Sequence, residues 1–236
     1  MTDYPVLVQT QMPDWNVIAQ QTLHERQEPL AELPPHPKLK PIPVYFQQRL
    51  DGAVDAVVVR RGVAERLCLA AGKLPENIGI ALFDGWRPLR VQRALRESMR
   101  VQVLARHPHA GRQRLESLLD EFVANPDRKG MCPPHLTGGS VDVGLFDIRT
   151  GEILDMGSAF DETVHLSHTA ALEDETESRF KLARLRRRML VAVMCWVGFS
   201  NLPSEWWHFD YGNQNWAYFT GAPFAFYGAA NWEKAA

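Results

Sequence analysis

Hydrophobic residues recur at helical spacing in four parts of the chain. The spacing predicts a helix over residues 53–71, ended by Gly72, and a second helix from Pro88 to just before Pro108. Two more helices are predicted over residues 113–123 and 176–196. The apolar positions of the first helix are Val59, Val63, Leu67 and Ala70, and those of the second are Val91, Leu95, Met99 and Val103.

Short apolar runs and period-two alternation predict strands between these helices. Residues 78–83 form a run typical of a buried strand. In residues 141–146 the odd positions are apolar, so Asp142 points to the opposite face of its strand. Further strands are predicted over residues 153–156 and 204–211. Because helices and strands mix without regular βαβ alternation, we expect an α+β fold with a mainly antiparallel central sheet flanked by helices.

Chain length and proline distribution predict one domain with peripheral ends. A chain of 236 residues is long enough for one sizeable core. Residues 30–43 contain five prolines, which exclude a helix and favour an extended connector. We therefore expect a single domain over residues 1–236, with residues 1–43 as a peripheral Pro-rich arm and residues 213–236 as an aromatic C-terminal tail.

Composition excludes several classes of protein. The chain is 45% hydrophobic and 23% charged, which argues against a disordered or fibrous protein. Lysine and arginine total 26 against 28 acidic residues, a net charge of -2, so no overall basic charge favours nucleic acid or an anionic membrane as partner.

The cysteines and the N-terminus predict a cytoplasmic protein. Cys68, Cys132 and Cys195 are odd in number and widely spaced, which fits neither a disulfide framework nor a thiolate zinc site. The first sixteen residues contain neither the basic residues nor the apolar run of a secretory signal. The longest apolar stretch, residues 189–199, is far shorter than the roughly 20 residues that cross a bilayer.

Four polar residues stand in apolar or aromatic segments and are the candidates for chemistry. His135 and Asp142 are separated by six residues, and Glu205 precedes His208 by three positions. Two imidazoles and one carboxylate can hold a catalytic zinc ion, which keeps a further position open for water. The alternative is that His208 is a hydrogen-bonded core histidine and that Asp142 forms a salt bridge with an arginine.

The order of these motifs resembles the VanX-type zinc D-Ala-D-Ala dipeptidases, which are hedgehog-like zinc peptidases. The matching segments lie within residues 78–212 and are DGWRP at 84–88, His135-x6-Asp142, MGSAFD at 156–161 and EWWH at 205–208. The resemblance implies one Zn²⁺ per chain, held by His135, Asp142 and His208. It also implies that Glu205 is the base that activates the zinc-bound water, and that Arg87 holds the tetrahedral oxyanion.

The resemblance further implies how substrate is held. Asp161 would anchor the ammonium group of a dipeptide, which limits the activity to very short peptides, and Trp206 would contact the substrate. The chain departs from the family at Cys132-Pro133-Pro134, where small hydroxylic residues usually precede the first zinc histidine. One hydrogen bond to the substrate is therefore expected to be missing.

These features lead to one expected function and two alternatives. We expect a cytoplasmic zinc dipeptidase for D-Ala-D-Ala or a related D,D-dipeptide, with no nucleic-acid or membrane partner. The alternatives are a D,D-carboxypeptidase or endopeptidase acting on cell-wall peptides, and a non-catalytic zinc-binding interaction module. The aromatic tail either covers a groove or makes a dimer contact, so a homo-oligomer stays open.

Two other groups are assigned no catalytic role. His165 and His168 are expected to stabilise a loop rather than form a second metal site. The basic run KLARLRRR at 181–188 is expected to be the solvated face of a helix rather than a nucleic-acid site.

Overall fold

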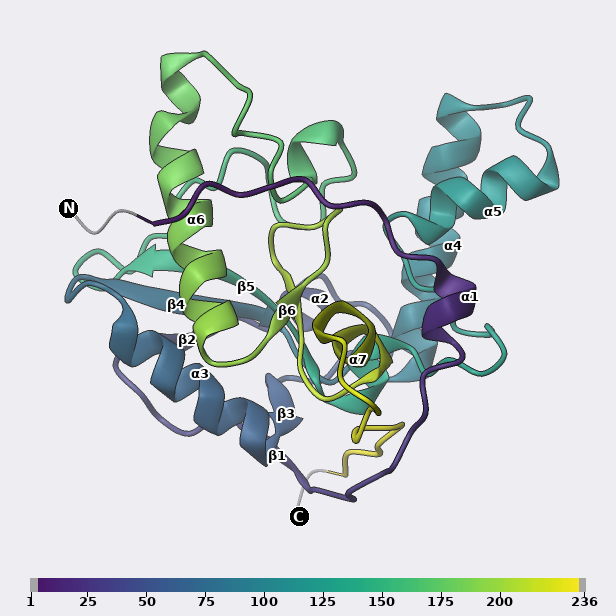
Figure 1. The fold of residues 1–236 in the computed structure, drawn as a ribbon, viewed down its shortest axis with the longest axis horizontal. Helices are drawn as coiled ribbons and strands as arrows, with labels where there is room; N and C mark the ends of the chain where they lie inside the picture. Colours follow the sequence, from purple (N-terminus) through teal and green to yellow (C-terminus); the bar gives the residue numbers. More distant parts are fainter. Residues whose placement is uncertain (1–3, 234–236) are drawn as a thin grey trace.

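The computed structural model describes residues 4–233, and a five-stranded sheet crosses its centre (Figure 1). In spatial order the strands are β2 (Leu39–Pro41), β4 (Ile78–Asp84), β5 (Ser140–Asp147), β7 (His208–Asp210) and β6 (Ser200–Asn201). The pairs β4–β5, β5–β7 and β7–β6 are antiparallel, whereas β2 runs parallel to β4. The expected α+β class is confirmed, but the sheet is mixed. The Pro-rich segment supplies the parallel strand, at the sheet edge where proline is tolerated.

A two-stranded antiparallel sheet joins β1 (Leu30–Glu32) to β3 (Val58–Arg60). The next element, α3 (Arg61–Lys73), therefore begins later than the helix predicted from residue 53. Three consecutive valines at 57–59 account for the difference, because β-branched side chains favour extended backbone. The helix predicted from the apolar spacing is therefore confirmed only from Arg61 onward.

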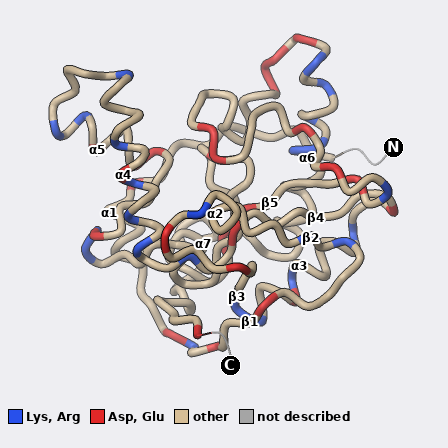
Figure 2. Tube along the Cα trace, turned by 180° about the vertical axis from the view of Figure 1, so that it is seen from behind, with Lys and Arg blue, Asp and Glu red and all other residues tan. Residues whose placement is uncertain are grey.

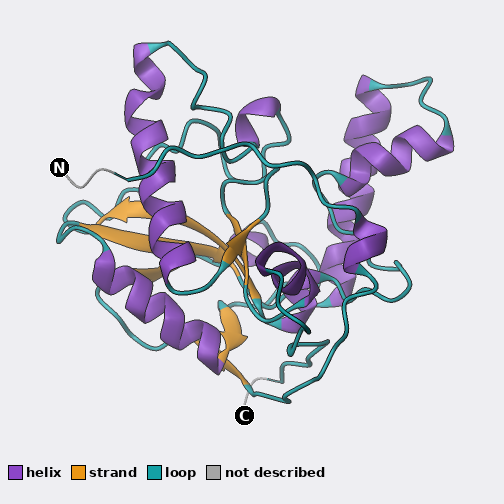
Figure 3. Cartoon of the chain, in the orientation of Figure 1, coloured by secondary structure: helices purple, strands orange, loops and turns teal. Residues whose placement is uncertain are grey.

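Helices cover the sheet and extend to one side of it (Figure 3). α3 packs against α6 (Lys181–Trp196), and α4 (Leu89–Arg106) packs against α5 (Arg112–Asp120) in a hairpin that projects from the body. The helix predicted over 88–107 is confirmed. The shorter helices are α1 (Trp15–Ile18), α2 (Val44–Gln47) and α7 (Gln214–Thr220), and the 3₁₀ turns are η1 (Pro134–Thr137), η2 (His165–Ser167) and η3 (Ser178–Phe180).

The main core lies between the central sheet and the α3–α6 pair. It includes Leu67, Ile80, Leu145, Met194 and Phe209, which are fully buried. A separate, smaller cluster holds the α4–α5 hairpin together, with Leu119 at its centre. The sheet is therefore anchored on one side by a large apolar layer, and the hairpin is a satellite unit.

Two predicted strands are shorter than expected. Residues 153–156 contribute only an isolated bridge between Phe146 and Ile153. Of residues 204–211, only β7 is a strand, because the chain before it forms turns, in which the Glu205 amide donates to the Leu202 carbonyl at 3.1 Å.

Both terminal segments pack onto the body and onto each other. Leu23 bridges to Ala225, and the His24 amide donates to the Ala225 carbonyl at 2.8 Å. Phe226 and Tyr227 are buried in the main core.

The surface carries both signs of charge. Figure 2 shows Lys and Arg interspersed with Asp and Glu along the trace, in keeping with the near-neutral net charge. Within residues 4–233, no helix is both long and apolar enough to cross a membrane.

Candidate active site

Three adjacent strands bring the candidate residues together. β5 pairs with β7 so that Asp142 lies opposite His208, which places both side chains on one face of the sheet. On the other side of β5, Asp84 of β4 lies opposite Asp142. His135 comes from η1, which ends at Gly138 with φ 70°, a left-handed conformation that suits glycine. The turn sends the chain directly into β5, so His135 and Asp142 face each other.

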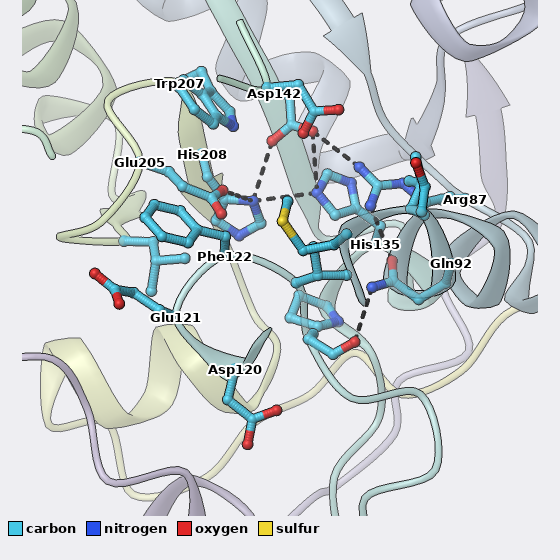
Figure 4. A pocket seen from close by; sticks show the side chains of 18 of the residues that line it. Arg87, Gln92, Asp120, Glu121, Phe122, His135, Asp142, Glu205, Trp207 and His208 are labelled. Atoms are coloured by element: carbon cyan, nitrogen blue, oxygen red, sulfur yellow. Dashed lines mark hydrogen bonds and ion pairs between the residues drawn. The ribbon is translucent and has the colours of Figure 1, made fainter. Parts of the chain in front are cut away.

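The side chains of His135, Asp142 and His208 converge on one point. His135 Nε2 lies 3.2 Å from His208 Nδ1, and His208 Nδ1 lies 3.1 Å from Asp142 Oδ1. His135 Nε2 is 3.4 Å from Asp142 Oδ2. One potential ligand atom from each residue falls within a group 4.8 Å across, and all three residues are buried (Figure 4).

The other ring nitrogen of each histidine is held from outside the cluster. His135 Nδ1 lies 2.8 Å from the Gly85 carbonyl oxygen, to which it donates. His208 Nε2 lies 3.0 Å from Asp210 Oδ2. These contacts leave His135 Nε2 and His208 Nδ1 facing each other beside a carboxylate, the donor set that zinc commonly takes. The residues present therefore fit a zinc ion.

Electrostatics also favour a cation at this point. Burial opposes the charged form of His208, but Asp210 and Asp142 outweigh it and raise the pKa of His208 well above its usual value. Burial would raise the pKa of Asp142, but His135 and His208 together lower it below its usual value. Without metal, a proton on His208 supplies positive charge beside the Asp142 and Asp210 carboxylates.

Arg87 is fixed beside the cluster by four contacts. Its Nε donates to Asp84 Oδ2 at 2.6 Å, Nη1 donates to Gln92 Oε1 at 2.9 Å, and Nη2 donates to Asp142 Oδ2 at 3.1 Å. Nη2 also reaches the Tyr45 hydroxyl at 3.4 Å. Burial would lower the pKa of Arg87, but its acidic neighbours raise it, so the guanidinium is a permanent cation with a fixed orientation.

Glu205 lies on the opposite side of the cluster, in the turn before β7. It is 7% exposed, and its Oε2 is 3.8 Å from His208 Nδ1. Burial raises the pKa of Glu205 to about 8, while the positive charge of His208 opposes the rise. A carboxyl group with a pKa close to neutral can both accept and return a proton.

A cavity opens over these residues and continues between α4, the end of α5 and α1. Its wall near the cluster includes Tyr45, Asp161 and Trp207, and its far end includes Trp15 and Phe122. Trp15 places part of the N-terminal arm in the wall of this cavity.

Two predicted substrate residues lie in different positions relative to the cavity. Asp161 is exposed at the cavity wall, in a left-handed conformation with φ 62°. Partial removal from water raises its pKa to about 6, and the charge of Arg87 opposes this rise. Trp206 is 2% exposed and lies outside the cavity wall, where its Nε1 donates to Ser158 Oγ at 2.9 Å. Its neighbour Trp207 lines the cavity instead.

Sequence reasoning missed two residues that orient the site. Gln92 accepts from Arg87 and donates through Nε2 to the Ala124 carbonyl at 3.0 Å, which links the arginine to the loop after α5. Asp210 also accepts from Ser140, Asn213 and Asn215. A signal for Asp210 existed, because residues two apart on a strand share a face, and Asp210 follows His208 by two.

The remaining candidates do not join the cluster. Cys132 is half-buried, and burial raises the pKa of its thiol to about 12, so it is a neutral packing group. His168 Nε2 lies 3.2 Å from Glu121 Oε1, and His165 stacks on His168 at 5.7 Å between ring centroids.

Comparison with known proteins finds a peptidase family and several relatives. Residues 51–224 match the profile of the peptidase M15 family, described as D-Ala-D-Ala dipeptidase. The D-alanyl-D-alanine dipeptidase of Synechocystis sp. is 29% identical over 205 residues, 81% of each chain. That of Streptomyces coelicolor is 33% identical over 167 residues, 66% of this chain and 76% of the relative. That of Enterococcus faecium is 29% identical over 177 residues, 72% and 77% of the two chains.

Among solved structures, the LdcB LD-carboxypeptidase matches 86% of this chain and 76% of its own at 15% identity. Its TM-score of 0.35 is too low to inform the fold. The family is shown by the sequence matches. With its buried His-Asp-His group, this chain belongs to the peptidase M15 family of D-Ala-D-Ala dipeptidases and is a metallopeptidase.

Proposed function

We propose that this metallopeptidase is a zinc-dependent dipeptidase that hydrolyses D-Ala-D-Ala or a related D,D-dipeptide. The observation that carries the proposal is the position of Glu205. A buried carboxyl group with a raised pKa stands beside the three converging ligand atoms, and a buried arginine lies across from it. A purely structural metal site requires neither group.

His135 Nε2, Asp142 and His208 Nδ1 would hold the zinc ion. When bound, zinc supplies a Lewis acid that polarises the scissile carbonyl and makes water more acidic. Gly85 and Asp210 hold the outer nitrogens of the two imidazoles, which leaves the inner nitrogen of each ring available to bind zinc.

Glu205 moves the proton. It accepts a proton from the attacking water as the oxygen bonds to the carbonyl carbon, and it then donates that proton to the leaving nitrogen as the C–N bond breaks. Burial raises the pKa of Glu205, which favours keeping the proton until the nitrogen leaves, while a neighbouring positive charge favours the carboxylate that accepts it.

Arg87 stabilises the negative charge that develops on the carbonyl oxygen. Because Asp84 and Gln92 hold the guanidinium in place, little reorganisation is required at the moment of reaction. Removing one such donor typically costs on the order of 10²- to 10³-fold in rate.

Asp161 binds the substrate ammonium and so selects for a free amino terminus. Its carboxylate is at the cavity wall close enough to Arg87 and Asp142 for their charges to influence it. A residue that pairs with the terminal ammonium sets the distance from the amino end to the scissile bond, which restricts the substrate to dipeptides.

The test is a hydrolysis panel with zinc-loaded protein. The panel contains D-Ala-D-Ala, L-Ala-L-Ala and N-acetyl-D-Ala-D-Ala. We expect D-Ala-D-Ala to be hydrolysed, with kcat/KM lower by about 10²-fold or more for the acetylated peptide, because Asp161 is then left without its cation.

Other outcomes would favour the two alternatives. Equal hydrolysis of the free and acetylated peptides would contradict a dipeptidase and support a carboxypeptidase or endopeptidase. No hydrolysis by protein with full zinc would support a non-catalytic zinc module.

A further inference from the structure

One arginine of the basic run at 181–188 is not on the solvated face that the sequence predicts. Arg187 of α6 is 1% exposed and lies under the segment 157–167, here called the Asp161 loop. Burial lowers the pKa of its guanidinium to about 9, so it remains a cation at neutral pH. A buried cation costs free energy unless its donors are satisfied, so its contacts indicate what it is for.

Arg187 binds both ends of the Asp161 loop. Its Nε donates to the Met156 carbonyl at 2.6 Å, just before the loop begins. At the other end, Nη2 donates to the Leu166 carbonyl at 2.7 Å and Nη1 donates to the His168 carbonyl at 2.9 Å. One rigid guanidinium therefore fixes the separation of the two ends of the loop.

The partners are carbonyl oxygens rather than carboxylates. Within residues 4–233, no Asp or Glu forms an ion pair with Arg187. A lysine has three donors on a single atom and cannot span three carbonyls that lie in different directions, as the planar guanidinium does.

The loop has to be held because its functional residue is strained. Asp161 adopts φ 62°, a left-handed backbone conformation that residues with a Cβ adopt infrequently. Ser158 at the start of the loop accepts from Trp206 Nε1 at 2.9 Å and lies 3.5 Å from Arg187 Nη2. The ring of Phe160 packs on Phe83 with 4.8 Å between centroids.

We propose that Arg187 is a positioning residue that fixes the Asp161 loop, and through it the Asp161 carboxylate, where a substrate ammonium can bind. The catalytic part of the proposal rests on the proposed dipeptidase function. The positioning part does not, because it concerns the loop itself.

The experiment compares Arg187→Lys with Arg188→Lys, a neighbouring control on the same helix. Arg188 binds Glu173, outside the Asp161 loop. KM and kcat are measured for D-Ala-D-Ala, and the inhibition constant is measured for N-propionyl-D-alanine, which lacks only the amino group. Hydrogen exchange of residues 157–167 is measured in the absence of substrate.

We expect Arg187→Lys to raise KM about tenfold or more with kcat changed less than about threefold, because a displaced anchor weakens ammonium binding. The inhibition constant of N-propionyl-D-alanine is expected to change less than about twofold, and exchange in the loop to accelerate. Arg188→Lys is expected to leave all of these close to wild type.

Two results would overturn the proposal. One is an equal rise in the KM of D-Ala-D-Ala and in the inhibition constant of N-propionyl-D-alanine, and the other is hydrogen exchange in the Asp161 loop no faster than in Arg188→Lys. If Arg187→Lys does not fold, Ser158→Ala replaces it and is expected to raise KM and loop exchange in the same direction. If the wild type hydrolyses no D-Ala-D-Ala, the proposed function fails, and the exchange measurement alone decides the role of Arg187.

Discussion

His135 and His208 show how individual polar residues prepare the site before any ligand binds. Each imidazole has one nitrogen engaged by an acceptor outside the cluster, Gly85 or Asp210, and one nitrogen directed inward. The family resemblance of the sequence motifs predicted that these two histidines are ligands, and the structure places their inward nitrogens beside Asp142. The motifs could not indicate the Gly85 carbonyl or Gln92, because those contacts depend on how β4 and α4 sit beside β5.

The protonation of His208 predicts how metal binding depends on pH. Asp210 and Asp142 raise the pKa of His208 well above its usual value, so the metal-free imidazole carries a proton at neutral pH. Zinc requires the lone pair on Nδ1, and binding must release that proton. The apparent zinc affinity should therefore fall about tenfold for each pH unit below the raised pKa.

Chelator competition at pH 6, 7 and 8 measures this dependence. The change in the affinity of the chelator itself has to be subtracted at each pH. An apparent affinity for zinc that is the same at all three values would show that His208 is already neutral in the metal-free protein.

At the scale of elements, the site depends on the pairing of β5 with β4 and β7. The alternating pattern of 141–146 correctly predicted a strand with Asp142 on the less apolar side, and β5 spans Ser140–Asp147. The pattern could not indicate that β2 joins as a parallel edge strand, because strand neighbours are chosen by tertiary packing. It also overestimated the helix at 53–71, where packing of β3 against β1 overrides the helical spacing.

The entry into β5 is tightly packed, which gives a prediction for Gly139→Ala. A Cβ at Gly139 would lie 2.4 Å from the Tyr211 carbonyl oxygen, so the strand would have to move away from the chain after β7. Overpacking of this kind typically costs about 1–3 kcal/mol. For a chain of this size, that corresponds to a fall in Tm of roughly 2–12 °C.

Gly111→Ala is the matched control, because a Cβ there meets no atom within 4 Å. Thermal unfolding of the two variants should separate them clearly. Equal Tm values for Gly139→Ala and Gly111→Ala would contradict the prediction, because they would mean that the backbone before β5 moves away from the Tyr211 carbonyl at no cost in stability.

At the scale of the whole molecule, the site lies where distant parts of the chain meet. The N-terminal arm contributes Trp15 and the turn after α5 contributes Phe122 to one cavity, while the C-terminal segment supplies Phe226 and Tyr227 to the core. Motif order in the sequence was sufficient to indicate the family and the three residues of the buried His-Asp-His group. It could not place the two ends of the chain, whose contacts with the body join residues about 200 positions apart, such as Leu23 and Ala225.

The most direct test of catalysis at the His-Asp-His cluster is the variant Glu205→Gln. Its zinc content and its turnover of D-Ala-D-Ala are measured beside those of the wild type. Glutamine keeps the size of the side chain but cannot accept the proton of the attacking water. We predict about one zinc ion per chain in both proteins, with turnover by the variant lower by about 10²- to 10⁴-fold. Wild-type turnover by the zinc-loaded variant would contradict the role of Glu205 as the base.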